Sequence, residues 1–205
     1  PSDHALAGMA ALFARHPDVV GANGRLLADG INSHGITLEE AEALIAAHDR
    51  LPPPPVPRIL KDMSGLYGCN MTYRTAAIGD ACFDERLALY GWQEDIDFAA
   101  QLLPRGRLVR TDAFAGVHRG VKGARTSGAR LGYSQVVNPL YLSRKGTMQP
   151  RYAARLMLNN VLANHLKALR PEPWVDRWGR VRGNWRGIWH VLTGRDDPRH
   201  ILDMR

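Results

Sequence analysis

The sequence has little of three features that would narrow its class at once: cysteine, long apolar runs and an amino-terminal leader. Only two cysteines are present, Cys69 and Cys82, too few for a disulfide framework, and their spacing matches no zinc site. We expect reduced thiols. No run of about 18 apolar residues exists, so no membrane-spanning helix is expected. The opening Pro1-Ser2-Asp3-His4 resembles no signal peptide, which predicts a cytoplasmic protein, and the missing initiator Met indicates a processed or partial chain.

Basic residues are scarce in the first half of the chain and acidic residues in the second. Residues 1–103 hold seven Lys or Arg against fourteen Asp or Glu, whereas residues 104–205 hold twenty against six. The basic half predicts an anionic partner, such as phosphates of a nucleotide sugar, a lipid-linked diphosphate, an anionic membrane leaflet or nucleic acid. Since no nucleic-acid-binding motif accompanies the charge, we expect no nucleic-acid partner. With 205 residues and 45% hydrophobic content, the chain can bury one substantial core.

The most informative stretch is residues 91–98, which read Gly-Trp-Gln-Glu-Asp-Ile-Asp-Phe. An apolar run follows it, so the pattern predicts a helix with an acidic first turn. Acids there can simply complement the positive end of the helix dipole. Alternatively, one carboxylate is a general base at the rim of a cleft, with Trp92 as an apolar wall beside it. The pattern alone leaves both interpretations open.

Further motifs flank this stretch in a distinctive order. They are Gly68-Cys69-Asn70-Met71-Thr72-Tyr73-Arg74, then Phe83-Asp84-Glu85-Arg86-Leu87, then residues 91–95, a helix, a strand and Val117-His118. In this order and spacing, residues 18–145 resemble family 2 glycosyltransferases of the GT-A fold. The resemblance implies an α/β catalytic domain with a mixed sheet and flanking helices over residues 1–148. A helical, basic, Trp-rich extension over residues 149–205 would follow it.

The same resemblance implies an activity. Family members invert the anomeric carbon as they move a sugar from a nucleoside-diphosphate-sugar to a hydroxyl of a glycan or lipid-linked acceptor, as in bacterial surface or exopolysaccharide synthesis. Asp95 matches the family's catalytic base. Glu94 would orient the acceptor or raise the proton affinity of Asp95, and Trp92 would stack on the acceptor sugar. A hydrolase that uses both acids fits poorly, because adjacent carboxylates rarely reach the separation of about 5 Å that glycoside hydrolysis needs.

Donor-side residues follow from the resemblance as well. Gly68, Cys69 and Asn70 would line the donor sugar, and His118 would help to bind a divalent metal, Mn²⁺ or Mg²⁺. Arg119, Lys122 and Arg125 lie in a glycine-rich basic loop that would face the diphosphate. The D-x-D loop that holds the metal in the family would lie upstream of Pro1, together with the nucleotide-binding part.

Each of these residues could instead have a purely structural role. Cys69 would then be a small packed residue, and Asn70 the cap of a short helix near Thr75. The basic loop would be solvated, and His118 would bind neither metal nor diphosphate. Asp84 and Glu85 read as structural acids that the adjacent Arg86 could neutralise.

Several local elements are predicted from pattern alone. Ser2 or Asp3 would cap a helix that has Leu6 and Leu12 on one apolar face, and residues 18–22 would form a short strand that ends in a turn at Asn23-Gly24. Thr37-Leu38-Glu39-Glu40 would open a second helix through a capping box. Residues 28–57 read as an insertion, and strands at residues 107–110 and 114–117 would deliver His118 to the end of the second strand.

The carboxyl-terminal third predicts helices at residues 131–145 and 152–169 and a final Trp-rich helix. Trp174, Trp178, Trp185 and Trp189 recur at helical spacing, with arginines mostly elsewhere. Such a face suits either peripheral contact with an anionic membrane or packing on the catalytic domain. The first option carries the alternative function: a non-catalytic membrane- or partner-binding module derived from a transferase.

Overall fold

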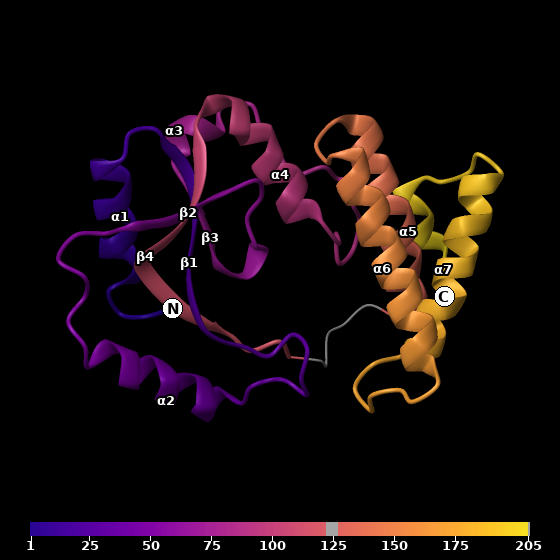
Figure 1. Ribbon diagram of the computed structural model, residues 1–205, viewed down its shortest axis with the longest axis horizontal. Coiled ribbons are helices and arrows are strands. Elements are labelled where there is room, and N and C mark those ends of the chain that lie inside the picture. The colour runs from indigo at the N-terminus through magenta and orange to yellow at the C-terminus, as the bar shows by residue number, and fades with distance from the viewer. Residues whose placement is uncertain (122–126, 205) are drawn as a thin grey trace. The chain divides into compact units, whose positions relative to one another are not determined.

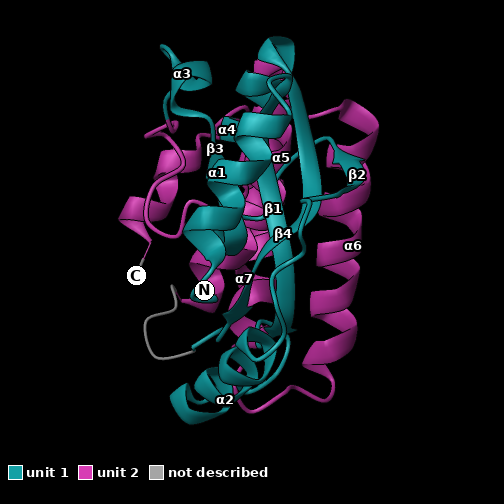
Figure 2. Ribbon diagram, turned by 90° about the vertical axis from the view of Figure 1, so that its left-hand side faces the viewer, with its two compact units in different colours: residues 1–82, 98–123 teal, residues 83–97, 124–205 magenta. Residues whose placement is uncertain are grey.

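The computed structural model describes residues 1–121 and 127–204 (Figure 1). The chain forms two compact units, coloured separately in Figure 2. The first comprises residues 1–82 and 98–123, and the second comprises residues 83–97 and 124–205. The second unit therefore groups residues 83–97, which hold the acidic stretch, with the carboxyl-terminal helices.

The first unit is built on a four-stranded mixed sheet, which confirms the predicted α/β class. The strands are β1 (Val19–Asp29), β2 (Ile59–Met63), β3 (Met71–Tyr73) and β4 (Arg107–His118), in the order β2-β4-β1-β3. The two long strands β1 and β4 are parallel, while β3 pairs antiparallel with β1 and β2 pairs antiparallel with β4. The predicted pair of short strands before His118 is thus one continuous strand.

Successive residues of the central strands point to opposite faces of the sheet, and each face has its own core. Val19 and Val109 pack with Leu12 of helix α1 (Ala5–Arg15). Val20 and Leu108 pack on the other side with Leu66, Phe98 and Leu102. The last two belong to α4 (Glu94–Leu102), so the apolar run after the acidic stretch is part of a buried layer.

Two local predictions about this unit are wrong. No turn occurs at Asn23-Gly24, because β1 continues to Asp29 with a register shift near this point. Gly24 lies so close to Phe114 that an added methyl carbon would be 2.3 Å from its ring, so the glycine serves close packing. Helix α1 begins after His4 without a side-chain cap, and Leu6 is 81% exposed rather than part of the apolar face.

The second helix, α2 (Leu38–Asp49), begins as predicted. Thr37 Oγ1 accepts a hydrogen bond from the Glu40 backbone N–H at 3.1 Å, and the Glu40 carboxylate accepts one from the Thr37 N–H at 2.8 Å. The Thr37 N–H, and after it the Thr37 hydroxyl, which also donates to this carboxylate at 3.0 Å, favour its charged form and lower the pKa of Glu40. Of the α2 residues, Ala41 is buried, while Leu38 and Leu44 are exposed.

The second unit is a bundle of three helices followed by a short turn. The helices are α5 (Gly128–Lys145), α6 (Pro150–Ala168) and α7 (Arg177–Leu192), and a 3-10 turn, η3, spans Pro198–Asp203. The predicted boundaries of α5 and α6 are confirmed to within about a turn, and the predicted Trp-rich helix begins at Arg177, after Trp174. Buried amides cross the bundle: Asn164 Nδ2 of α6 donates to Gln135 Oε1 of α5 at 2.7 Å and to Asn184 Oδ1 of α7 at 3.0 Å. Such a satisfied polar ladder fixes the register of the helices.

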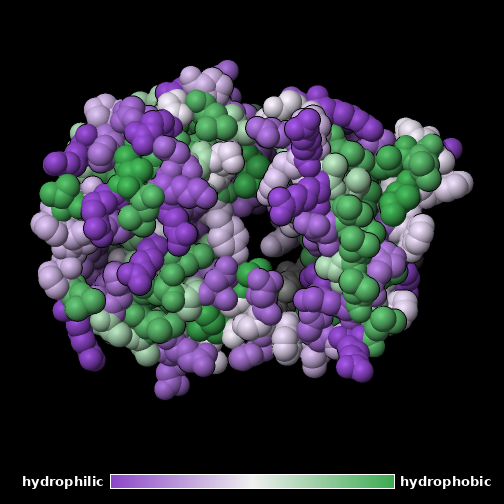
Figure 3. Space-filling view, viewed as in Figure 1, coloured by the Kyte–Doolittle hydropathy of each residue, from purple (hydrophilic) through white to green (hydrophobic). Residues whose placement is uncertain are grey.

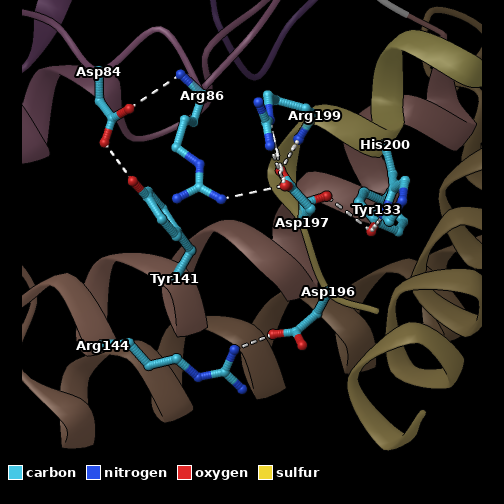
Figure 4. A network of polar contacts seen from close by, with 9 residues as sticks. All are labelled: Asp84, Arg86, Tyr133, Tyr141, Arg144, Asp196, Asp197, Arg199 and His200. Atoms are coloured by element: carbon cyan, nitrogen blue, oxygen red, sulfur yellow. Dashed lines mark hydrogen bonds and ion pairs between the residues drawn. The ribbon is translucent and has the colours of Figure 1, made fainter. Parts of the chain in front are cut away.

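The segment before and within η3 is tied to the bundle by charged groups (Figure 4). The carboxylate of Asp197 accepts hydrogen bonds from Arg199 at 2.8 Å and from Arg86 at 3.2 Å. These contacts, the first above all, hold the pKa of Asp197 well below its usual range. The Tyr133 hydroxyl donates to the Asp197 carbonyl at 3.1 Å, while Ile201 packs beside the Tyr133 ring. The end of the chain is therefore part of the bundle core.

Candidate functional site

The predicted site residues are divided between the two units. Trp92, Glu94 and Asp95 belong to the second unit. Gly68, Cys69, Asn70, His118 and Arg119 belong to the first. Lys122 and Arg125 lie outside the described residues.

The loop that leads into α4 has an unusual backbone. Leu89 (φ 60°) and Gln93 (φ 76°) adopt left-handed conformations that cost side-chain-bearing residues free energy, and Gly91 between them has φ 59°. The Gly91 carbonyl accepts from the Glu94 N–H at 2.7 Å. A methyl carbon added at Gly91 would lie 2.0 Å from Glu94 Oε2, so the Glu94 carboxylate rests against this glycine. Strain of this kind clusters at functional sites.

The three acids at the start of α4 lie in three different environments. Glu94 is exposed, Asp95 is half-buried and Asp97 is completely buried. Desolvation of its carboxyl, with the charge of Asp95 as the second cause, raises the pKa of Glu94. Asp95 Oδ1 accepts a hydrogen bond from the Ile96 N–H at 2.9 Å. The backbone thus holds the Asp95 carboxylate at the first turn of the helix.

Asp97 has other partners than Glu94 and Asp95. Its carboxylate accepts hydrogen bonds from Lys145 Nζ at 2.7 Å and from Thr147 Oγ1 at 2.6 Å. Lys145 also donates to Asp84 at 2.7 Å. Partial burial opposes the charge of Lys145, but these two carboxylates outweigh it and raise its pKa. Asp97 is therefore a structural acid that fixes the start of α4 to the end of α5.

Asp84 is structural too, although its partners differ from the predicted one. Burial works against its charged form, yet hydrogen bonds from Lys145 and Tyr141 prevail and lower its pKa. The Tyr141 hydroxyl donates to Asp84 Oδ2 at 2.6 Å (Figure 4). Arg86 donates to this carboxylate from its backbone N–H. The Arg86 guanidinium turns instead to Asp197.

Two buried carbonyl oxygens lie in the side chains around Trp92. Asn138 of α5 is 2% exposed, and its Nδ2 donates to the Trp92 carbonyl at 2.8 Å. Within the described part of the chain, Asn138 Oδ1 and Gln93 Oε1 have no hydrogen-bond partner. A buried acceptor without a donor is costly, so both oxygens call for a donor beyond the described residues, such as a bound water or a ligand. Sequence reasoning missed Asn138, because 46 residues separate it from Trp92.

The first unit has a cavity of about 210 Å³ beside the middle of β1. Residues that line it include Asn23, Asp29, Met63, Tyr67, Asn70 and Arg110. Asn23 shapes one wall, since its Nδ2 donates to the Asn70 carbonyl at 2.6 Å and its Oδ1 accepts from the Tyr67 N–H at 2.7 Å. Asn70 Nδ2 is buried and finds no partner among residues 1–121 and 127–204. The cavity therefore offers an amide donor to a ligand.

The residues around Asn70 correct two predictions. Asn70 ends a 3-10 turn, η1 (Gly68–Asn70), and the N-cap of the short helix α3 (Thr75–Ile78) is Arg74. Asn70 is thus not a helix cap. Cys69 is exposed and forms no disulfide, and it is not the packed residue that the sequence predicts. Asn23 and Asp29 were missed because the Asn23-Gly24 pair predicts a turn instead of a strand.

His118 stands at the end of β4, as predicted, and is oriented by two neighbours. Its Nδ1 lies 2.8 Å from Asp29 Oδ1 and 3.1 Å from the Tyr67 hydroxyl. A carboxylate on one ring nitrogen is the arrangement that commonly directs the other nitrogen of a histidine toward a metal. Arg119, next in the chain, donates from Nε to the Ile36 carbonyl at 3.2 Å. Its head group thus holds the segment before α2.

Among the described residues, no cluster of three or more His, Cys, Asp or Glu side chains could hold a metal ion by itself. His118 is therefore at most one ligand of a site that other groups would complete. No protein-family model, curated protein or solved structure matches this chain.

Proposed function

We propose that this chain is the acceptor-side part of an inverting glycosyltransferase of the GT-A type, with Asp95 as the catalytic base. The observation that carries the proposal is the division of the three acids at the start of α4. Asp97 is bound by Lys145 and Thr147, whereas Asp95 is half-buried and accepts from the Ile96 N–H in the first turn of α4, directly after a strained loop. A partly exposed carboxylate at a fixed helix start is placed to accept a proton from a bound hydroxyl.

The surroundings of Asp95 support an acceptor rich in hydroxyl groups. Asn138 Oδ1 and Gln93 Oε1 are acceptors without a donor within the described residues. A sugar hydroxyl can donate to such an oxygen, and Trp92 supplies an apolar surface of the type that sugars stack on. The fixed helix start would keep the acceptor hydroxyl within reach of the base.

The proposed reaction moves one proton and one glycosyl group. The acceptor hydroxyl gives its proton to the Asp95 carboxylate while its oxygen bonds to the anomeric carbon of the donor. The bond from that carbon to the diphosphate oxygen breaks, and the nucleoside diphosphate leaves with the electron pair. Because attack and departure occur on opposite sides, the anomeric configuration inverts.

The cavity beside β1 is the proposed donor-side site. Asn70 Nδ2 would donate to a donor hydroxyl, and His118, held by Asp29, would be one ligand of a divalent metal. Such an ion, when bound, supplies positive charge beside the departing diphosphate. His118 fits this role through its second ring nitrogen, while Asp29 and Tyr67 fix the ring.

Calorimetric titration with UDP, GDP and dTDP, each with Mn²⁺, tests this donor assignment. We expect saturable binding of one nucleotide and its loss in Asn70→Ala and His118→Ala. Gly146→Ala, which changes an open turn in the second unit, is the matched control and should bind normally. A folded wild-type chain that binds none of the three nucleotides would remove the donor-side part of the proposal.

A further inference from the structure

The Trp-rich helix α7 exposes its large side chains instead of packing them. Trp178, Trp185 and Trp189 are 59%, 60% and 62% exposed. They recur at steps of seven and four residues, so they share one face of the helix. On α6, Leu158 and Leu162 are one turn apart and also exposed, as is Leu169 at the C-cap of this helix. Both helices thus have an outward apolar face.

Glycines explain why the tryptophans turn outward. Gly183 of α7 approaches α5 so closely that a methyl carbon there would lie 2.0 Å from the Ala129 carbonyl oxygen. On α5, a methyl carbon added at Gly132 would lie 2.1 Å from the Arg180 carbonyl oxygen. The small face of α7 therefore packs on α5. The sequence left open whether the tryptophans pack on the catalytic domain. Within this unit, the helix packs through its glycines and leaves Trp178, Trp185 and Trp189 exposed.

The outward faces of α6 and α7 adjoin each other. His165 of α6 meets Trp185 of α7 edge to face, with ring centroids 5.8 Å apart, directly beside the buried pair Asn164 and Asn184. Figure 3 shows apolar surface along α6 and on part of α7. We call the exposed side of these two helices the α6–α7 face. Six exposed large apolar side chains gather on it, and such a patch marks an interaction site.

Charge indicates what that partner is. Neither α6 nor α7 contains an acidic residue. Arg151 and Arg155 are exposed on α6, and Arg182 and Arg186 on α7. Arg182 lies one turn from both Trp178 and Trp185, so positive charge is interleaved with the aromatic rings. A surface of this composition complements a partner that is apolar inside and anionic at its boundary.

We propose that the α6–α7 face docks on an anionic lipid bilayer, with both helices lying in the plane of the interface. Trp rings favour the headgroup level of a bilayer, leucines reach the acyl boundary, and arginines pair with lipid phosphates. No described helix has the length and apolar character needed to cross a membrane, so the contact is peripheral. This inference does not depend on the proposed transfer reaction.

Two other occupants fit the face less well. A second copy of the chain would place arginine against arginine, because a two-fold interface pairs a patch with itself and neither helix supplies an acid. Nucleic acid could stack on the tryptophans, but the exposed leucines of α6 can neither stack on its bases nor pair with its phosphates. Both occupants are outcomes of the test below.

The test measures co-sedimentation of the full chain with vesicles. We expect binding to vesicles of equal parts phosphatidylglycerol and phosphatidylcholine, little binding to pure phosphatidylcholine, and weakening with added salt. Lipids brominated near the headgroup should quench Trp emission more than lipids brominated near the chain end. Trp178→Gln/Trp189→Gln should weaken binding at least about tenfold, because both side chains are already exposed and their loss spares the fold.

Leu6→Gln/Leu60→Gln is the matched control, because it removes two exposed apolar residues of the first unit. It should bind vesicles like the wild type. The proposal is overturned if the folded wild type does not co-sediment with anionic vesicles, or if the tryptophan variant binds these vesicles as tightly as the control does. Concentration-dependent dimers or oligonucleotide complexes that disappear in the tryptophan variant, without vesicle binding, would overturn it in favour of the other occupants.

Discussion

Lys145 Nζ donates a hydrogen bond of 2.7 Å to Asp97 Oδ2, and 48 residues separate the two in the chain. The Asp97 side chain is fully buried, whereas that of Lys145 is 28% exposed. The pair joins the first turn of α4 to the last turn of α5 and so positions Asp95, two residues before Asp97. A buried carboxylate that pairs with a cation at this distance depends strongly on that cation.

Lys145→Met should therefore lower the free energy of unfolding by about 3 kcal/mol, since it removes this cation from the buried Asp97 carboxylate. Chemical denaturation measures the change. Lys167→Met is the matched control: Lys167 is 55% exposed and pairs with Glu172, so its loss should cost less than about 1 kcal/mol. Equal costs for the two variants would contradict the structural role given to Asp97. Asp97→Asn in the Lys145→Met background should recover part of the loss.

The same network predicts how stability depends on pH. Asp84 has a lowered pKa, so its contribution is complete above the ordinary value of 3.8 and is lost as pH falls through the folded-state pKa. Lys145 has a raised pKa, so its contribution is complete below the ordinary value of 10.5 and is lost as pH rises through the folded-state pKa. The stability difference between wild type and Lys145→Met should be constant near neutrality and narrow at both extremes. A difference that stays constant as pH falls from neutrality to the acid-unfolded state would refute this linkage.

Gly91→Ala should destabilise the loop before α4 for two reasons. Its φ of 59° disfavours any side chain, and the added methyl would collide with Glu94 Oε2. Gly146 has a positive φ as well but open space around it, so Gly146→Ala isolates the backbone cost of about 1 kcal/mol. We expect Gly91→Ala to cost more than this control and the excess to shrink in a Glu94→Ala background. If denaturation gives both alanine variants the same cost, the Glu94 carboxylate does not rest on Gly91.

Two asparagines of the cavity beside β1 should behave differently. Asn23→Ala removes hydrogen bonds to the backbone of Tyr67 and Asn70, so it should lower both stability, by about 2 kcal/mol, and nucleotide binding. Asn70→Ala should weaken binding alone, because Asn70 Nδ2 bonds to none of the described residues. Thermal unfolding and calorimetry separate the two effects. A loss of stability for Asn70→Ala equal to that for Asn23→Ala would show that Asn70 is structural.

Local signals in the sequence were sufficient for several elements. The Thr37 capping box, the acidic start of α4 and the periodicity of α5 to α7 each depend on residues within a few positions of one another. Such signals act over one helical turn, which is why the sequence predicts them well. The turn at Asn23-Gly24 failed for the opposite reason. Partners some 45 residues away on the backbone of Tyr67 and Asn70, and the ring of Phe114, hold this pair inside a strand.

The candidate site shows the same limit. Asp95 and Glu94 could be singled out from the acidic stretch, but the sequence could not assign Asp97 to Lys145 or connect Trp92 to Asn138. Nor could it show that the glycines of α7 face α5 and leave the tryptophans exposed. These relationships depend on which helices pack together, and the pattern of one helix does not contain that information.

The central claim, that Asp95 is the base of a sugar transfer, is tested most directly by turnover of the Asp95→Asn variant. Its rate should be measured with a panel of UDP-, GDP- and dTDP-sugars, beside wild type and Glu85→Gln, which changes an exposed acid of the same unit. We predict that Asp95→Asn loses about 10²- to 10⁴-fold in rate while it unfolds like the wild type, and that Glu85→Gln transfers normally. Near-normal turnover by Asp95→Asn, or no turnover of any donor by the folded wild type, would contradict the claim.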